Sequence, residues 1–159
     1  MNSKMTYGGI GPKLALITLP YVILSIIIMQ RDPQFLFMNV PDSLWLKIPG
    51  LILLAGGLLF YMFTIVIFLA DFKNGQLITR GPFALCRNPI YATFLVFIIP
   101  GLALFLQSGL TLSIDLVLYI NFRISIHGEN RVLERQFGQE YIAYRSRVNE
   151  LIPVPRINK

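Results

Sequence analysis

The residues best suited to chemistry lie in two polar segments, each beside a long apolar run. One segment is Arg87-Asn88-Pro89-Ile90-Tyr91, and the other is Glu129-Asn130. Pro89 suits the first position of a helix, where unpaired backbone N–H groups and the Arg87 side chain would together favour an anion. Glu129 carries the opposite charge and could hold a cation such as an amino group. Two separated segments of this kind predict one polar pocket, in which the Arg87 side would bind an anionic group and the Glu129 side a cationic group.

Both segments also have simpler interpretations, which the residues alone leave open. The basic residues of the loop from Asp71 to Arg87 could serve only to orient the chain in a membrane. Glu129 could be a first-turn acid of a C-terminal helix, where a negative charge is favourable.

A second polar set recurs at every fourth position, namely Asp115, Tyr119, Arg123 and His127. On a helix these residues share one slowly drifting face. Ionisable residues within a membrane span usually face a bundle interior or a cavity. A small transporter using this face would explain the set but would leave Arg87–Tyr91 unexplained. His127 lacks Cys or carboxylate companions, so we expect no metal site.

The chain that must position these residues is mostly apolar. It has 159 residues, of which 55% are hydrophobic and only 14% are charged, whereas a soluble domain averages about 25% charged residues. We therefore expect one all-α integral-membrane domain over residues 1–159, with the lipid bilayer as its surroundings. The net charge of +6 is explained by basic residues flanking apolar runs, and we expect no nucleic-acid partner. The single cysteine, Cys86, excludes an intramolecular disulfide.

Four apolar runs predict transmembrane helices, at about 12–30, 48–70, 89–106 and 110–127. Gln107-Ser108-Gly109 predicts a tight turn between the last two. The segment 35–46 is too short to span and suits an interfacial loop or a short surface helix. Lys and Arg gather on the side that carries both termini, so the positive-inside rule places the termini in the cytoplasm.

The C-terminal part, from Glu129 onward, is charged and predicts a cytoplasmic amphipathic helix. Its apolar stripe consists of Leu133, Phe137, Tyr141, Tyr144 and Val148. Gly138 should interrupt or bend this helix. The stripe could pack on the membrane surface or on the cytoplasmic ends of the spans.

An ordered succession of motifs covers the second half of the chain, from about residue 75 to 156. The motifs are Gly81-Pro82-Phe83, Arg87–Tyr91, Pro100–Leu104, Glu129–Tyr144, Arg147-Val148 and Ile152-Pro153. This succession resembles the integral-membrane isoprenylcysteine carboxyl methyltransferase family, which is related to the phospholipid N-methyltransferases. The Arg-Asn-Pro variant is familiar in the broader bacterial family and favours a prokaryotic cell membrane.

The resemblance implies S-adenosylmethionine as methyl donor. It implies donor-binding roles for Gly75, Gln76, Leu77 and Ile78 near the end of the second span, for Phe83 against the donor, for Asn88, Pro89, Ile90 and Tyr91 as the main motif, and for Glu129 from the far side. The predicted catalytic residues are Glu129, which would position the donor, and Arg87 or Arg123, which would orient an anionic acceptor. Alignment and exclusion of water would supply most of the catalysis.

Several positions depart from the carboxyl methyltransferase pattern. Phe83 replaces Tyr, Asn88 replaces His, Asn130 replaces the second Glu of a Glu-Glu pair, and Ser125 replaces a substrate-holding Arg. We therefore expect methyl transfer to a lipophilic or small acceptor, with O- or S-methylation of a prenylcysteine carboxylate-like compound favoured. The alternatives are a phospholipid N-methyltransferase and a non-catalytic member of the family. The oligomeric state stays open.

Overall fold

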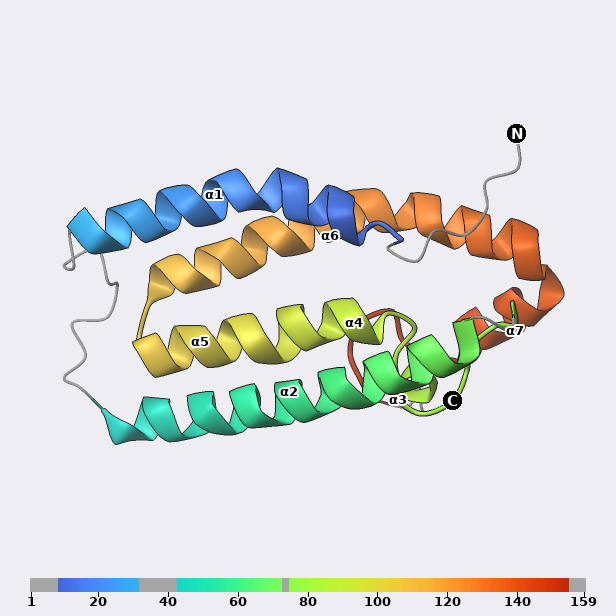
Figure 1. Ribbon diagram of the computed structural model, residues 1–159, viewed down its shortest axis with the longest axis horizontal. Coiled ribbons are helices and arrows are strands. Elements are labelled where there is room, and N and C mark those ends of the chain that lie inside the picture. Colours follow the sequence, from blue (N-terminus) through green and yellow to red (C-terminus); the bar gives the residue numbers. More distant parts are fainter. Residues whose placement is uncertain (1–8, 32–42, 73–74, 155–159) are drawn as a thin grey trace.

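The protein is built from helices that run nearly parallel to one long axis (Figure 1). The computed structural model describes residues 9–31, 43–72 and 75–154. Its elements are α1 (Gly11–Arg31), α2 (Leu44–Phe72), α3 (Pro82–Leu85), α4 (Pro89–Ala92), the π-helix η2 (Thr93–Ile98), α5 (Ile99–Leu106), α6 (Gly109–Phe137) and α7 (Gln139–Arg147). Within these residues, 4 helices are long and apolar enough to cross a membrane, the third being the rod Pro89–Leu106 formed by α4, η2 and α5. The predicted all-α polytopic membrane fold is confirmed.

Two predicted boundaries need correction. The second span begins at Leu44 rather than 48, so Leu44, Trp45 and Leu46 form its first turn, while residues 35–42 of the predicted interfacial segment lie outside the described residues. The fourth helix does not end at 127 but continues to Phe137. No proline interrupts that stretch, and Gly138, with φ of 53°, is the first residue that leaves the helical conformation. Glu129 therefore lies inside a helix and is not a first-turn acid.

The long helices form two neighbouring pairs. Figure 1 shows α1 beside α6, and α2 beside the rod of α4, η2 and α5. The second pair is close because glycines face each other. A Cβ atom on Gly50 would lie only 2.8 Å from the carbonyl oxygen of Gly101, and one on Gly57 would lie 2.6 Å from the Cβ of Phe97. Small residues allow such approach between membrane helices.

The rod and α6 meet in the tight turn that the sequence predicts. Gln107 adopts the left-handed conformation directly after α5, and the Ser108 hydroxyl accepts a hydrogen bond from the Thr111 backbone N–H at 3.2 Å. This is ordinary N-capping of α6. Because the turn reverses the chain, the start of α4 and the end of α6 return to the same end of the molecule.

The C-terminal residues fold back over that end (Figure 1). Gly138 separates α6 from α7, as predicted. The apolar stripe forms a small core, in which Tyr141, Tyr144 and Val148 are buried and pack with Leu133, Phe137 and Leu77. After α7, Asn149 forms an isolated parallel bridge with Cys86. The tail thus packs on the loop before α4 and holds it in place.

Candidate functional site

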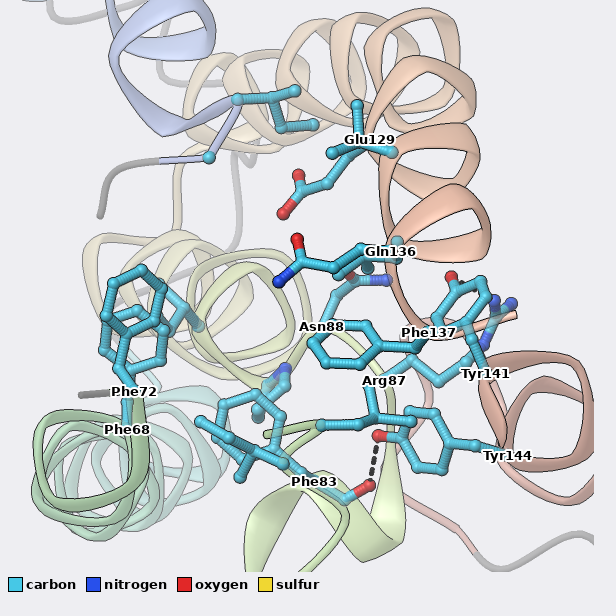
Figure 2. A pocket seen from close by; sticks show the side chains of 18 of the residues that line it. Phe68, Phe72, Phe83, Arg87, Asn88, Glu129, Gln136, Phe137, Tyr141 and Tyr144 are labelled. Atoms are coloured by element: carbon cyan, nitrogen blue, oxygen red, sulfur yellow. Dashed lines mark hydrogen bonds between the residues drawn. The ribbon is translucent and has the colours of Figure 1, made fainter. Parts of the chain in front are cut away.

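A cavity of about 690 Å³ lies at the end of the molecule where α2 and α6 finish and α4 begins (Figure 2). Residues from every predicted donor-binding segment line it: Gly75, Gln76, Leu77, Ile78, Phe83, Asn88, Pro89, Ile90, Tyr91 and Glu129. Of the predicted catalytic residues, Arg87 and Glu129 also line it, whereas Arg123 does not. Segments that are far apart in the sequence are therefore brought to one cavity.

The polar wall of the cavity comes from α6. Figure 2 shows Glu129 and Gln136, two turns apart, with their polar ends directed toward the middle of the cavity. The Glu129 Oε2 atom is buried and has no hydrogen-bond partner among the described residues. Its Oε1 atom lies against the backbone of Gly9, where an added Cβ would approach to 2.8 Å. A buried carboxylate oxygen without a donor is costly, so this wall suits a ligand that supplies an N–H or O–H group.

The opposite walls are aromatic and apolar. Phe68 and Phe72 lie on successive turns of α2 with their ring centroids 4.9 Å apart, and Phe83 and Phe137 also line the cavity (Figure 2). Tyr144 is fixed by donating its hydroxyl hydrogen to the carbonyl oxygen of Phe83 at 2.6 Å. Flat rings around a polar centre suit a ligand with both a planar apolar part and charged groups.

Asn88 and Arg87 are positioned by the tail rather than by the membrane helices. The Arg87 backbone N–H donates to the carbonyl oxygen of Asn149 at 2.8 Å, and the Asn88 backbone N–H donates to that of Glu150 at 3.2 Å. The Asn88 side chain donates from Nδ2 to the same Glu150 carbonyl oxygen at 3.1 Å. Asn88 directly precedes α4, whose first residue is Pro89, as predicted. These contacts hold Asn88 at the edge of the cavity.

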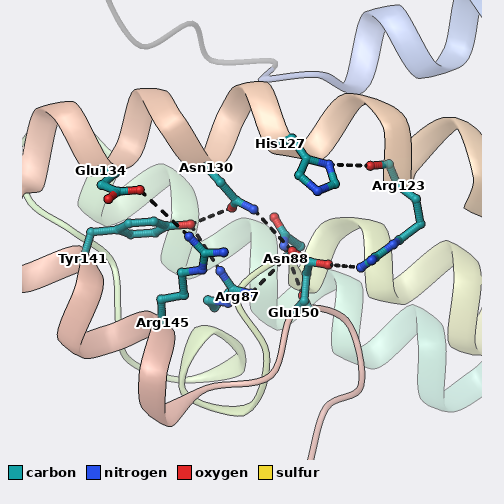
Figure 3. A network of polar contacts seen from close by, with 9 residues as sticks. All are labelled: Arg87, Asn88, Arg123, His127, Asn130, Glu134, Tyr141, Arg145 and Glu150. Carbon is teal, nitrogen blue, oxygen red and sulfur yellow. Dashed lines mark hydrogen bonds and ion pairs between the residues drawn. The ribbon is translucent and has the colours of Figure 1, made fainter.

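A polar network surrounds the Arg87 guanidinium (Figure 3). Arg87 donates to the Tyr141 hydroxyl at 3.3 Å and to Glu150 Oε1 at 3.4 Å. Arg123 forms an ion pair with Glu150 Oε2 at 2.7 Å, and Asn130 donates to Glu150 Oε1 at 3.3 Å. The Arg87 Nε atom is buried and has no partner among the described residues.

Burial also changes the acidity of Cys86, which lies outside the cavity lining, and of Tyr141 and Tyr144, which line the cavity. Loss of solvent raises the pKa of the Cys86 thiol to about 12, although a hydrogen bond from the Asn88 backbone opposes the shift. Burial likewise raises the pKa values of the Tyr141 and Tyr144 hydroxyls above their usual range. The neighbouring Arg87 charge partly opposes the shift at both tyrosines. These three groups stay protonated at neutral pH, so they can donate hydrogen bonds but do not act as nucleophiles.

A family model described as phospholipid methyltransferase matches residues 46–140, more than half of the chain. The chain belongs to this family. Comparisons with curated proteins and with solved structures gave no match. The matched residues run from the first turn of α2 into α7 and include Arg87, Asn88 and Glu129. Membership in the phospholipid methyltransferase family makes the protein a membrane methyltransferase and fits the resemblance found in the sequence.

The phospholipid methyltransferase match does not extend to all residues that build the cavity. Gly9, Ile10 and Lys13 also line it, although no motif in the sequence marks them as site residues. Glu150 was missed as well, because a single acid in a charged tail carries no pattern. A signal was present for Gln136, which lies seven residues after Glu129 and hence on the same helix face.

Proposed function

We propose that the protein transfers a methyl group from S-adenosylmethionine to a lipophilic acceptor, with the donor bound in the cavity of Figure 2. One observation carries the proposal. Two buried polar atoms of residues that line this cavity have no hydrogen-bond partner within the described part of the chain. They are the carboxylate oxygen Glu129 Oε2 and the guanidinium nitrogen Arg87 Nε. The methionine part of the donor has an ammonium group and a carboxylate, which are complementary to these two atoms.

The proposed roles follow from this complementarity. Glu129 would accept hydrogen bonds from the ammonium group, and Arg87 would donate to the carboxylate. The aromatic side chains of Phe83, Phe137 and Tyr144 would pack on the planar adenine. Gly75–Ile78 and Asn88–Tyr91 would supply the remaining contacts, as the family resemblance implies. Arg123 lies outside the cavity in its ion pair with Glu150, so we assign it no contact with either substrate.

The donor supplies a methyl group activated by the positive sulfur. The acceptor's electron pair forms the new bond to the methyl carbon, while the electrons of the broken carbon–sulfur bond stay on sulfur. Such a displacement depends on alignment of the reacting atoms and on exclusion of water. The aromatic walls and the packed tail would contribute to both. A carboxylate or thiolate acceptor needs no base, which is consistent with the absence of a free imidazole among the described cavity residues.

The acceptor should reach the cavity from the bilayer. The cavity is lined by Phe68 and Phe72 of α2, by Ile10 just before α1 and by Lys13 in the first turn of α1. The helices α1 and α2 are not among those that pack closely together. We therefore propose a lipophilic acceptor, with O- or S-methylation of a prenylcysteine carboxylate-like compound favoured. The description of the matched family makes a phospholipid amine the second candidate. An amine must lose its proton before it attacks, so activity that rises with pH would favour it.

We propose further that all 159 residues form one domain, with a catalytic core at about 75–156 that needs the ends of α1 and α2 to complete its cavity. The positive-inside rule would place this cavity end in the cytoplasm, because the loop before α4 and the chain from Glu129 onward carry nine of the 14 Lys and Arg residues.

Calorimetry on the detergent-purified full chain tests donor binding, and transfer of labelled methyl groups to a membrane extract tests turnover. We expect saturable binding of S-adenosylmethionine and a labelled lipid-soluble product. Absence of donor binding would refute the proposed function. Binding without transfer to any lipid fraction would instead support a non-catalytic member of the family.

A further inference from the structure

The Glu150 carboxylate is the central anion of the network beside the cavity (Figure 3). It accepts hydrogen bonds or ion pairs from Arg87 at 3.4 Å, from Asn130 at 3.3 Å and from Arg123 at 2.7 Å. Only a fifth of its side chain is exposed. A carboxylate with three such partners, one from the loop before α4 and two from α6, is fixed in position and charge-compensated.

Arg87 depends on this carboxylate for compensation. Its side chain is 9% exposed, and its other side-chain contact among the described residues is the uncharged Tyr141 hydroxyl. Arg123 is half exposed and can be screened by water. Removing the charge of Glu150 would therefore leave a largely buried, uncompensated cation in the wall of the cavity.

The proposed donor carries one more positive charge than its demethylated product, S-adenosylhomocysteine, because its sulfur is a sulfonium. The two molecules are otherwise nearly identical in shape. Both molecules carry the same carboxylate and ammonium groups, so excess positive charge in the wall would act unequally only through the sulfonium, which it would repel in the donor alone.

We propose that Glu150 is a positioning residue that sets the electrostatic preference of the cavity for the sulfonium donor over its uncharged-sulfur product. It acts through Arg87 and does not itself line the cavity. The inference rests on the proposed function, since it assumes that the cavity binds the donor.

The test measures the dissociation constants of S-adenosylmethionine and S-adenosylhomocysteine for the full chain in detergent, at low and high salt. In Glu150→Gln we expect the ratio of donor to product affinity to fall by about fivefold or more at low salt, and by less at high salt. Glu134→Gln is the matched control. Glu134 is a half-exposed acid on α6 with a 3.9 Å ion pair to Arg145, and it does not line the cavity.

A second variant moves the charge instead of removing it. Asn130 accepts a hydrogen bond from the Tyr141 hydroxyl at 2.6 Å and donates to Glu150. The double substitution Asn130→Asp with Glu150→Gln exchanges the carboxylate and the amide while keeping a donor–acceptor pair. We expect it to restore the affinity ratio toward that of the unmodified protein.

The outcomes separate the two proposals. If the unmodified protein binds neither molecule, the proposed function is wrong. If it binds both, but Glu150→Gln weakens them equally, Glu150 has only a structural role and the inference fails. If Glu150→Gln does not fold, the double variant decides, and a lowered donor-to-product ratio in that variant also overturns the inference.

Discussion

Glu129→Gln separates binding from stability. The substitution preserves the shape of the side chain and removes its charge. Glu129 Oε2 is buried and unpaired among the described residues. In the ligand-free protein that oxygen contributes nothing favourable, so its loss should leave the melting temperature unchanged or slightly higher. Functional sites commonly contain groups that cost stability until the ligand binds.

Donor binding should respond in the opposite direction. A hydrogen bond that involves a charged group contributes about 1.5–3 kcal/mol, which corresponds to a loss of affinity of about 10- to 150-fold. A donor concentration of 100 times the dissociation constant stabilises a protein by about 2.7 kcal/mol. At that same concentration a variant that binds tenfold more weakly would gain only about half as much. The shift in melting temperature caused by the donor should shrink accordingly.

Calorimetry and thermal unfolding in detergent check both quantities. Glu134→Gln on the same helix is the matched control, because the same chemical change is made at a half-exposed acid outside the cavity. Undiminished donor affinity in Glu129→Gln, or an equal loss in Glu134→Gln, would refute the role assigned to Glu129.

Three further predictions concern the frame of the site. Gly50→Ala should destabilise the protein by about 1–3 kcal/mol in a thermal unfolding assay, because the new Cβ would lie 2.7 Å from the Phe105 backbone nitrogen. A Cβ added at Gly56 would meet no atom within 4 Å, so the control Gly56→Ala should be neutral in the same assay. Gly138→Ala should cost about 1–3 kcal/mol, since φ of 53° and ψ of −126° suit glycine alone, and an unchanged melting temperature would count against the turn described between α6 and α7. Because the pKa of Cys86 is raised from 9.0 to about 12, the unfolded chain loses this proton first, and stability should fall by about 1.4 kcal/mol per pH unit between these values. In Cys86→Ala the slope should be shallower by this amount, since only the contribution of groups such as Tyr141 and Tyr144 remains. Maleimide should leave the folded protein unlabelled at pH 8.

The sequence predicts the membrane helices well because a bilayer imposes a simple requirement. Each span needs an apolar run of sufficient length, and the turn at Gln107-Ser108-Gly109 is the most polar point of its run. The end of α6 was predicted less well. Hydropathy falls after residue 127, but hydropathy reports the surroundings of a helix and not its end, and α6 continues until Gly138 leaves the helical conformation.

Sequence patterns could not predict the long-range contacts of the two chain ends. Glu150 contacts Arg87 and Arg123 through a segment with no regular periodicity. Gly9 reaches Glu129 only because α1 packs along α6. In both cases the sequence shows which residue types are present, whereas the three-dimensional packing determines which of them meet.

The tail connects the membrane helices to the chemistry of the site. The loop before α4 has few backbone partners of its own, and the N–H groups of Arg87 and Asn88 are satisfied by the carbonyl oxygens of Asn149 and Glu150. Tyr144 fixes Phe83 from the same side. Four spans alone would leave these backbone groups without protein partners, because the helices satisfy only their own hydrogen bonds. The folded tail therefore fixes the positions of Arg87 and Asn88 relative to the cavity, and the spans fix the position of the cavity relative to the membrane.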